Sequence, residues 1–179
     1  MATDVMLDLE TLGTRPDTVI LTLGAVKFNP FSDEIYGDKT LYIKPDVDEQ
    51  LTMGRTTDED TITWWGKQSL EVYEEAMGTE GRISIDDFLN QLCKFIVGAD
   101  RIWCQGPVFD IAILENLMRQ VGRPIPWVFW RIRDSRTLLQ ALGDNRDPNR
   151  SQAHNAMADC VYQAQAVQQA IANYGLTQA

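Results

Sequence analysis

Two carboxylates near the N-terminus, Asp8 and Glu10, are separated by a single leucine within the apolar run from Met6 to Gly13. Side chains alternate between the two faces of an extended strand, so both acids would point the same way. Two negative charges held side by side on a hydrophobic strand repel each other unless one takes a proton or a cation lies between them. The pattern therefore allows two interpretations: a cation-binding pair at the exit of a strand, or a half-exposed strand with a solvated acidic face.

Three further residues have the chemistry to join such a site. Asp110 falls in the first turn of a predicted helix, where the positive end of the helix dipole favours a carboxylate. His154, the only histidine, lies in a polar stretch five residues before Asp159. Five residues rotate by about 140° on a helix, so the two side chains could not share a helical face. With His154 in the loop that leads into the final helix and Asp159 one turn inside it, both can aim at one point. Each residue taken alone has an ordinary structural interpretation.

Taken together and in order, these residues form three motifs that resemble a known family. Asp8-x-Glu10, Phe109-Asp110 and His154-x-x-x-x-Asp159 are similar to the motifs of the DEDDh 3′-to-5′ exonucleases of the DnaQ-like, ribonuclease H-fold superfamily, and they span nearly the whole chain. The sister DEDDy group would carry a tyrosine four residues before the last aspartate, where this chain has Asn155.

Two further segments refine the resemblance. The segment Thr61-Ile62-Thr63-Trp64-Trp65 and the chain length resemble the branch that contains phage exonuclease A and Rv-type exoribonucleases. Many relatives carry an asparagine shortly before Phe-Asp in the second motif, whereas this chain has Gln105-Gly106-Pro107-Val108. We therefore leave the substrate contacts near Gln105 open.

The resemblance implies a metal-dependent enzyme that hydrolyses phosphodiester bonds at the 3′ ends of single-stranded DNA or RNA and releases nucleoside 5′-monophosphates. Carboxylate oxygens suit two hard divalent cations, Mg²⁺ or Mn²⁺, which together stabilise the attacking and leaving oxygens. By the same resemblance, His154 would be the general base, and the metal ligands would be Asp8, Glu10, Asp110 and Asp159.

The resemblance also suggests substrate contacts. The main chain of Thr11 would hold the terminal nucleotides, Leu12 would wedge between the bases, and Phe109 would stack on one of them. For Leu12 and Phe109 the alternative is a plain core role. Trp64 and Trp65 could offer a stacking platform, and we assign this role to Trp65, although adjacent helical residues cannot share one face. Five arginines could guide phosphate or could simply be solvated: Arg131, Arg133, Arg136, Arg146 and Arg150.

The elements that must position these residues alternate between strands and helices. Strands are predicted around the first acidic pair and over 19–28 and 35–43, which together suggest an antiparallel meander. A loop is predicted over 46–57, and helical patterns follow from Asp58 through Tyr73 and over 84–98. Two strands, 101–105 and 128–132, are each followed by a helix, over 106–121 and 135–142. A loop over 143–152 precedes a final helix over 155–174. The chain is thus predicted to be α/β: a mixed sheet with a three-strand antiparallel meander and two parallel strands, flanked by helices, and ribonuclease H-like by the resemblance.

Composition limits the remaining choices. A chain of 179 residues with 44% hydrophobic content is expected to form one domain over 1–179. No apolar run has the length of a membrane span and no signal peptide precedes the first strand, so we expect a cytoplasmic protein. Three scattered cysteines predict buried free thiols, namely Cys93, Cys104 and Cys160. The net charge of −10 argues against a broad basic surface for nucleic acid, although it allows a local grip on one strand end.

Two other functions remain open from the sequence. An endonuclease of ribonuclease H type would share the fold but lacks the His-x-x-x-x-Asp ending. A non-catalytic module that binds nucleic acid or protein could retain the fold, but degenerate modules usually lose one or more of the acids. All five positions are filled here, which favours catalysis. The sequence leaves the oligomeric state open.

Overall fold

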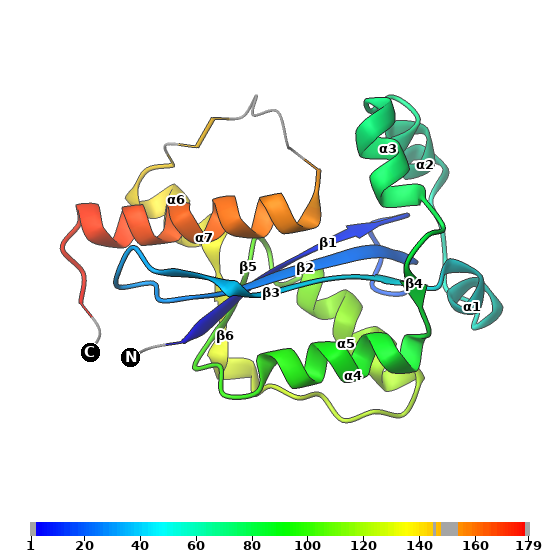
Figure 1. The fold of residues 1–179 in the computed structure, drawn as a ribbon, viewed down its shortest axis with the longest axis horizontal. Helices are drawn as coiled ribbons and strands as arrows, with labels where there is room; N and C mark the ends of the chain where they lie inside the picture. Colours follow the sequence, from blue (N-terminus) through cyan, green and yellow to red (C-terminus); the bar gives the residue numbers. More distant parts are fainter. Residues whose placement is uncertain (1–2, 145, 148–153, 178–179) are drawn as a thin grey trace.

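A computed structural model describes residues 3–144, 146–147 and 154–177. Its centre is a six-stranded sheet in the order β4-β3-β2-β1-β5-β6 (Figure 1). The meander is antiparallel and consists of β1 (Asp4–Thr11), β2 (Ile20–Phe28) and β3 (Ile35–Pro45). The strands that extend the sheet from β1 run parallel to it, and they are β5 (Ile102–Cys104) and β6 (Ile132–Asp134). The predicted α/β fold is confirmed. The short strand β4 (Arg82–Ile83), parallel to β3, was not predicted.

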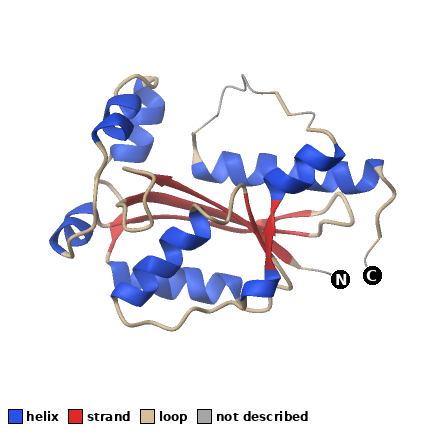
Figure 2. Ribbon diagram, turned by 180° about the vertical axis from the view of Figure 1, so that it is seen from behind, coloured by secondary structure: helices blue, strands red, loops and turns tan. Residues whose placement is uncertain are grey.

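Helices cover both faces of this sheet (Figures 1 and 2). One face carries α4 (Ile85–Ile96) and α5 (Asp110–Gln120), and the other carries α6 (Ser135–Leu142) and α7 (Ala156–Asn173). The remaining helices lie toward the carboxyl end of β1, and they are α1 (Val47–Thr52), α2 (Glu59–Trp65) and α3 (Leu70–Met77). Across the described part of the chain, no helix is both long enough and apolar enough to span a membrane.

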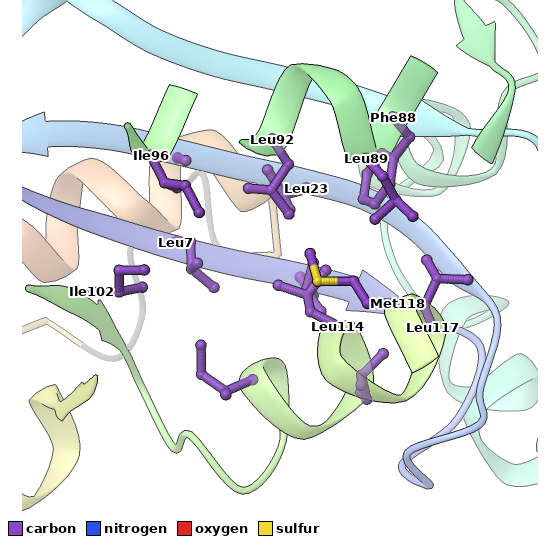
Figure 3. Close-up of a cluster of buried hydrophobic side chains, with 14 of the residues drawn as sticks. Leu7, Leu23, Phe88, Leu89, Leu92, Ile96, Ile102, Leu114, Leu117 and Met118 are labelled. Atoms are coloured by element: carbon purple, nitrogen blue, oxygen red, sulfur yellow. The ribbon is translucent and has the colours of Figure 1, made fainter. Parts of the chain in front are cut away.

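Strand β1 divides its side chains between two cores, as its alternation predicts. Leu7 and Leu9 belong to the cluster formed with the buried faces of α4 and α5, which Figure 3 shows from close by. Met6 belongs to the opposite cluster, together with Cys160 and Val167 of α7. Because Asp8 and Glu10 alternate with the first set, they lie on the α7 side of the sheet.

Capping residues explain where the helices begin, including one that sequence analysis missed. The side chain of Ser84 accepts a hydrogen bond from the backbone N–H of Asp87 and starts α4, as predicted. The loop predicted over 46–57 is wrong at α1, because Asp46 caps a helix there in the same way. Asp58 and Ser69 cap separate helices, so the helical pattern from 58 to 73 belongs to α2 and α3 rather than to one helix.

The strand predicted over 128–132 is displaced toward the C-terminus. A single 3-10 turn occupies Phe129–Arg131, and β6 begins only at Ile132, where pairing with β5 starts. The side chains of Phe129 and Trp130 are 81% and 63% exposed, so their apolar character did not indicate a buried strand. The helix predicted over 135–142 is confirmed as α6.

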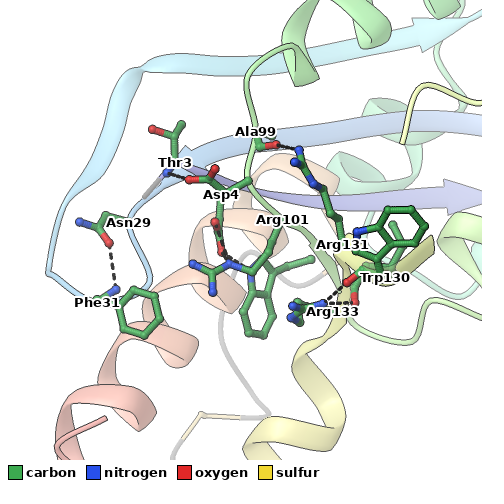
Figure 4. A network of polar contacts seen from close by, with 12 residues as sticks. Thr3, Asp4, Asn29, Phe31, Ala99, Arg101, Trp130, Arg131 and Arg133 are labelled. Carbon is green, nitrogen blue, oxygen red and sulfur yellow. Dashed lines mark hydrogen bonds and ion pairs between the residues drawn. The ribbon is translucent and has the colours of Figure 1, made fainter. Parts of the chain in front are cut away.

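Polar contacts fasten the start of β1 to β5 (Figure 4). The buried carboxylate of Asp4 accepts hydrogen bonds from the indole N–H of Trp103, at 2.6 Å, and from Arg101, which also forms an ion pair with it at 2.9 Å. These contacts hold the amino end of β1 beside β5. All three cysteines are free thiols, with Cys104 and Cys160 buried and Cys93 partly buried.

Candidate active site

A cleft of about 460 Å³ opens above the carboxyl end of β1 on the α7 side of the sheet. Its walls come from β1, from the segments that begin α5 and α6, and from α7 with the residues before it. All five residues that sequence analysis proposed for catalysis line it, and they are Asp8, Glu10, Asp110, His154 and Asp159. The structure thus brings together positions that are up to 151 residues apart in the chain. Their catalytic roles remain predictions.

The carboxylates form a compact group. Oxygen atoms of Asp8, Glu10 and Asp159 all lie within 4.8 Å of one another. Asp110 is 3% exposed, and its Oδ1 accepts a hydrogen bond of 3.1 Å from the backbone N–H of Leu9, between the two acids of β1. This bond ties the start of α5 to the acidic end of β1, and the fourth carboxylate lines the same cleft as the other three.

A glycine that sequence analysis did not single out lets α7 approach this closely. Gly24 of β2 pairs with Asp8 across the sheet, and a Cβ atom at Gly24 would lie 2.4 Å from the carbonyl group of Ala156 in the first turn of α7. The thiol of Cys160 donates a hydrogen bond of 3.0 Å to the Gly24 carbonyl. An isolated glycine inside a strand pattern often marks such a close backbone approach, and this was the available signal.

Two of the four carboxyl groups, those of Glu10 and Asp110, have raised pKa values and therefore resist ionisation. Burial, followed by the negative charge of Asp110, raises the pKa of Glu10 well above its ordinary value. Burial also raises the pKa of Asp110, even though the Leu9 N–H bond and the charge of Arg136 act in the opposite direction. A divalent cation would remove both penalties, and a donor set made only of carboxylate oxygens suits a hard cation. The residues present therefore fit a metal site.

His154 sits just before α7 in an unusual backbone conformation. Its φ angle is 68°, in the left-handed region, and its backbone N–H donates a hydrogen bond of 3.0 Å to Oδ2 of Asp159. Asn155 caps α7 by accepting from the N–H of Ala158 at 3.0 Å. The imidazole meets the ring of Trp64 edge to face, with centroids 4.7 Å apart. His154 therefore lies in the lead-in to the helix and Asp159 one turn inside it, which is the arrangement that the five-residue spacing required.

Three of the four residues predicted to contact substrate are buried, and they are Thr11, Leu12 and Trp65. Trp65 is 1% exposed, and its indole N–H donates to the carbonyl of Thr11 at 2.9 Å, so its ring cannot stack on a base. Leu12 packs in the same buried cluster as Trp65, in line with its alternative core role, and Thr11 is also buried. Trp64 is 38% exposed and is the tryptophan next to His154. Phe109 lines the cleft, and its stacking role stays a prediction.

Two of the five arginines proposed for phosphate line the cleft. Arg136 reaches it from α6, and Arg146 reaches it from the loop that follows. Arg146 donates one hydrogen bond to Oε1 of Gln105 and forms an ion pair with Asp144 at 2.7 Å. The glutamine in the second motif thus holds an arginine at the mouth of the site.

Two of the remaining three arginines, Arg131 and Arg133, do not line the cleft. Arg131 donates to the carbonyl of Ala99, and Arg133 donates to the carbonyls of Trp130 and Ile132, at the amino end of β6 and away from the cleft (Figure 4). Arg150 lies outside the described residues. Of the four proposed arginines that the structure describes, two therefore line the cleft and two lie at the amino end of β6.

Sequence analysis missed two residues of α7 that line the cleft, Tyr162 and Gln163. The side-chain N–H of Gln163 donates a hydrogen bond of 2.9 Å to Oδ1 of Asp8. The hydroxyl of Tyr162 accepts one from the backbone N–H of Asp147 at 2.5 Å. Gln163 follows Asp159 by four residues, a spacing that places both on one helical face, and this was the only signal for it in the sequence.

Comparisons with known proteins agree with this geometry. The sequence model of the Rv2179c-like family, described as a 3′-5′ exoribonuclease domain, matches residues 3–171. The exodeoxyribonuclease of Enterobacteria phage T4 is 28% identical over 165 residues, which cover 78% of this chain and 71% of the phage protein.

Solved structures share the fold at low sequence identity. Cell-death related nuclease 4 superimposes with a TM-score of 0.68 at 16% identity, covering 98% of this chain and 65% of that one. A zinc-bound complex of E. coli exonuclease I with single-stranded DNA gives a TM-score of 0.67 at 20% identity, covering 97% of this chain and 41% of that one. The chain thus spans less than two thirds of the length of either solved protein.

Proposed function

The chain belongs to the Rv2179c-like family of 3′-5′ exoribonuclease domains, and from this premise we propose that its cleft removes nucleotides from the 3′ end of a single strand. We propose DNA as the preferred strand and RNA as the competing substrate. The chain is a 3′-5′ exonuclease, a hydrolase of phosphodiester bonds. The observation that carries the proposal is the meeting of four carboxylates and His154 in one cleft. The preference for DNA rests on the likeness to the phage exodeoxyribonuclease along 71% of its length.

The carboxylates would hold two divalent cations, Mg²⁺ or Mn²⁺. Asp8, Glu10 and Asp159 already bring their oxygens within 4.8 Å, and Asp110 lies buried beside them on the same cleft. When bound, such cations supply positive charge to the scissile phosphate and make water a stronger acid. Burial raises the free energy of ionised carboxylates without a cation. The same weak dielectric screening strengthens their electrostatic attraction to a bound cation.

His154 would act as the general base. A ring nitrogen of its imidazole would accept the proton of the attacking water, a task to which the imidazole group is suited. The edge-to-face contact with Trp64 and the bond from its own backbone N–H to Asp159 restrict where the ring can lie. The protein therefore positions the proton acceptor against a carboxylate that would hold metal.

Local contacts would hold the strand end in a chain of net charge −10. Phe109 and the exposed ring of Trp64 could stack on terminal bases, while Arg136 and Arg146 offer positive charge to phosphates. Because only these two arginines supply positive charge among the described residues of the cleft, binding of the nucleic acid strand is expected to be weak and to decrease as the salt concentration rises. Discrimination between DNA and RNA would depend on contacts to the 2′-hydroxyl.

The direct test uses matched 5′-labelled single strands of DNA and RNA with Mg²⁺ or Mn²⁺, and a chelator as control. We expect shortening from the 3′ end that the chelator abolishes and that is faster on DNA. Faster cleavage of RNA would overturn the sugar preference alone. Absence of cleavage with either strand would favour the non-catalytic binding module that keeps the fold.

We further propose that residues 1–179 act as one domain in the cytoplasm. A reducing compartment fits the three free thiols, two of which, Cys104 and Cys160, are buried in the core. The same core continues from β1 to α7, at opposite ends of the chain.

A further inference from the structure

The side chain of Gln163 is built into the acidic cluster although it carries no charge. It projects from α7 one turn beyond Asp159, is 5% exposed, and lines the cleft. Its Nε2 donates to Oδ1 of Asp8 at 2.9 Å. A hydrogen bond to one carboxylate oxygen fixes the plane of the group, and therefore the direction in which the other oxygen points.

The other end of the same amide has no hydrogen-bond partner among the residues that the structure describes. Within the described part of the chain, Oε1 of Gln163 is buried and accepts no hydrogen bond. A buried acceptor without a donor costs free energy, so the native fold keeps few of them. Because Gln163 lines the cleft, the donor that satisfies Oε1 can enter with the contents of the cleft, and water carried by a hydrated divalent cation is such a donor.

A second buried glutamine on the same helix shows what a purely structural role looks like. Nε2 of Gln168 donates to the carbonyls of Asn29 and Glu34, at 2.9 and 2.8 Å, in the turn between β2 and β3. Gln168 is 7% exposed, close to the exposure of Gln163, but it does not line the cleft. One glutamine fastens a turn, and the other bonds a carboxylate in the cleft.

We infer that Gln163 is a positioning residue for metal binding: it orients Asp8 through Nε2 and offers Oε1 to a water molecule on the bound cation. This inference rests on the proposed metal-dependent function and deepens it. Partners of metal-binding carboxylates commonly change metal affinity or activity by 10- to 100-fold when they are removed. Gln163 would act through Asp8 and would not touch the substrate.

The test compares Gln163→Met with the matched control Gln168→Met, since methionine keeps a similar length without polar hydrogen-bonding groups. Mn²⁺ affinity is measured on the full chain from the electron paramagnetic resonance signal of free Mn²⁺. We expect Gln163→Met to weaken Mn²⁺ binding about tenfold and to lower kcat at subsaturating Mn²⁺ without raising KM for the oligonucleotide. Gln168→Met should bind Mn²⁺ like the unsubstituted protein.

Stability without metal separates the two roles further. With chelator present, Gln168→Met should unfold at a lower temperature because two carbonyls lose their donor. Gln163→Met should lose less stability, because it gives up one hydrogen bond to Asp8 and removes a buried Oε1 that has no donor among the described residues. Equal Mn²⁺ affinity in Gln163→Met and the unsubstituted protein would overturn the inference. Failure of the unsubstituted protein to bind Mn²⁺ or to cleave would instead overturn the proposed function.

Discussion

The substitution Asp8→Asn tests whether the acidic cluster is held together against its own repulsion. Asparagine keeps the shape of the side chain and an acceptor oxygen for Gln163, so it removes one charge and little else. Two unit charges 4.8 Å apart repel by about 1 kcal/mol in bulk water and about 3.5 kcal/mol at an effective dielectric constant of 20. Burial and the charge of Asp110 raise the pKa of Glu10 to about 8, so near that pH Glu10 adds less than one full negative charge to the cluster.

We therefore expect the metal-free Asp8→Asn protein to be more stable than the parent by about 1 to 3 kcal/mol at pH 8. The gain should shrink at pH 5.5, where protonation relieves the cluster in the parent as well. The assay is urea unfolding with chelator at both pH values, followed by thermal unfolding with and without Mn²⁺. Asp8→Asn should also lose the stabilisation that Mn²⁺ gives the parent, and it should not cleave.

A different outcome would refute the reasoning. If Asp8→Asn were destabilised equally at pH 5.5 and pH 8, the carboxylate would be serving as an ordinary structural acceptor. If Mn²⁺ still stabilised the variant as much as the parent, Asp8 would not belong to the cation site.

Three further predictions follow from the same geometry. Gly24→Ala should destabilise the protein by about 1 to 3 kcal/mol, because the new methyl group would meet the backbone of α7. It should also lower cleavage, because α7 would carry Asp159 away from Asp8. Unfolding and cleavage assays on one preparation check both effects. His154→Gly and His154→Ala should both lose cleavage. The glycine variant should be more stable than the alanine variant by about 1 kcal/mol, because φ at this position is 68° and glycine adopts such a conformation without strain. Equal unfolding midpoints of the two variants would argue against backbone strain at residue 154. The metal-free protein should lose stability as the pH rises above the ordinary carboxyl pKa values, which are 4.5 for Glu10 and 3.8 for Asp110. The reason is that the folded state retains protons that the unfolded chain releases in this pH range. With chelator, the unfolding temperature should fall from pH 5 to pH 8, and with saturating Mn²⁺ it should fall less.

Local signals in the sequence predicted most of the fold. Alternation along β1 placed Leu7 and Leu9 opposite Asp8 and Glu10, and Ser84 marked the start of α4. Local sequence patterns gave the wrong element in two segments, where the same residues fit more than one secondary structure. Asp46 looked like part of a polar loop until its cap on α1 was visible, and an apolar run ahead of β6 forms an exposed turn instead of a strand.

The sequence predicted the residues of the site that belong to the three motifs, but not the residues whose place depends on tertiary contacts. The order of the three motifs identified the five residues that meet in the cleft. No sequence pattern separates Trp64 from Trp65, because only the packing of α2 against Thr11 decides which ring is buried. Gly24 and Gln163 also depend on contacts between segments far apart in the chain, so their functions became visible only in three dimensions.

The most direct test of the central claim follows one single-stranded oligonucleotide labelled at either end, with Mn²⁺, in the parent and in Asp159→Asn. The parent should convert the 5′-labelled strand into a ladder that shortens from its 3′ end and should release the 3′ label at once as a mononucleotide. Asp159→Asn, or chelator, should abolish both signals. Internal cleavage that leaves the 3′ label on longer fragments, or activity that survives loss of the Asp159 carboxylate, would contradict the account.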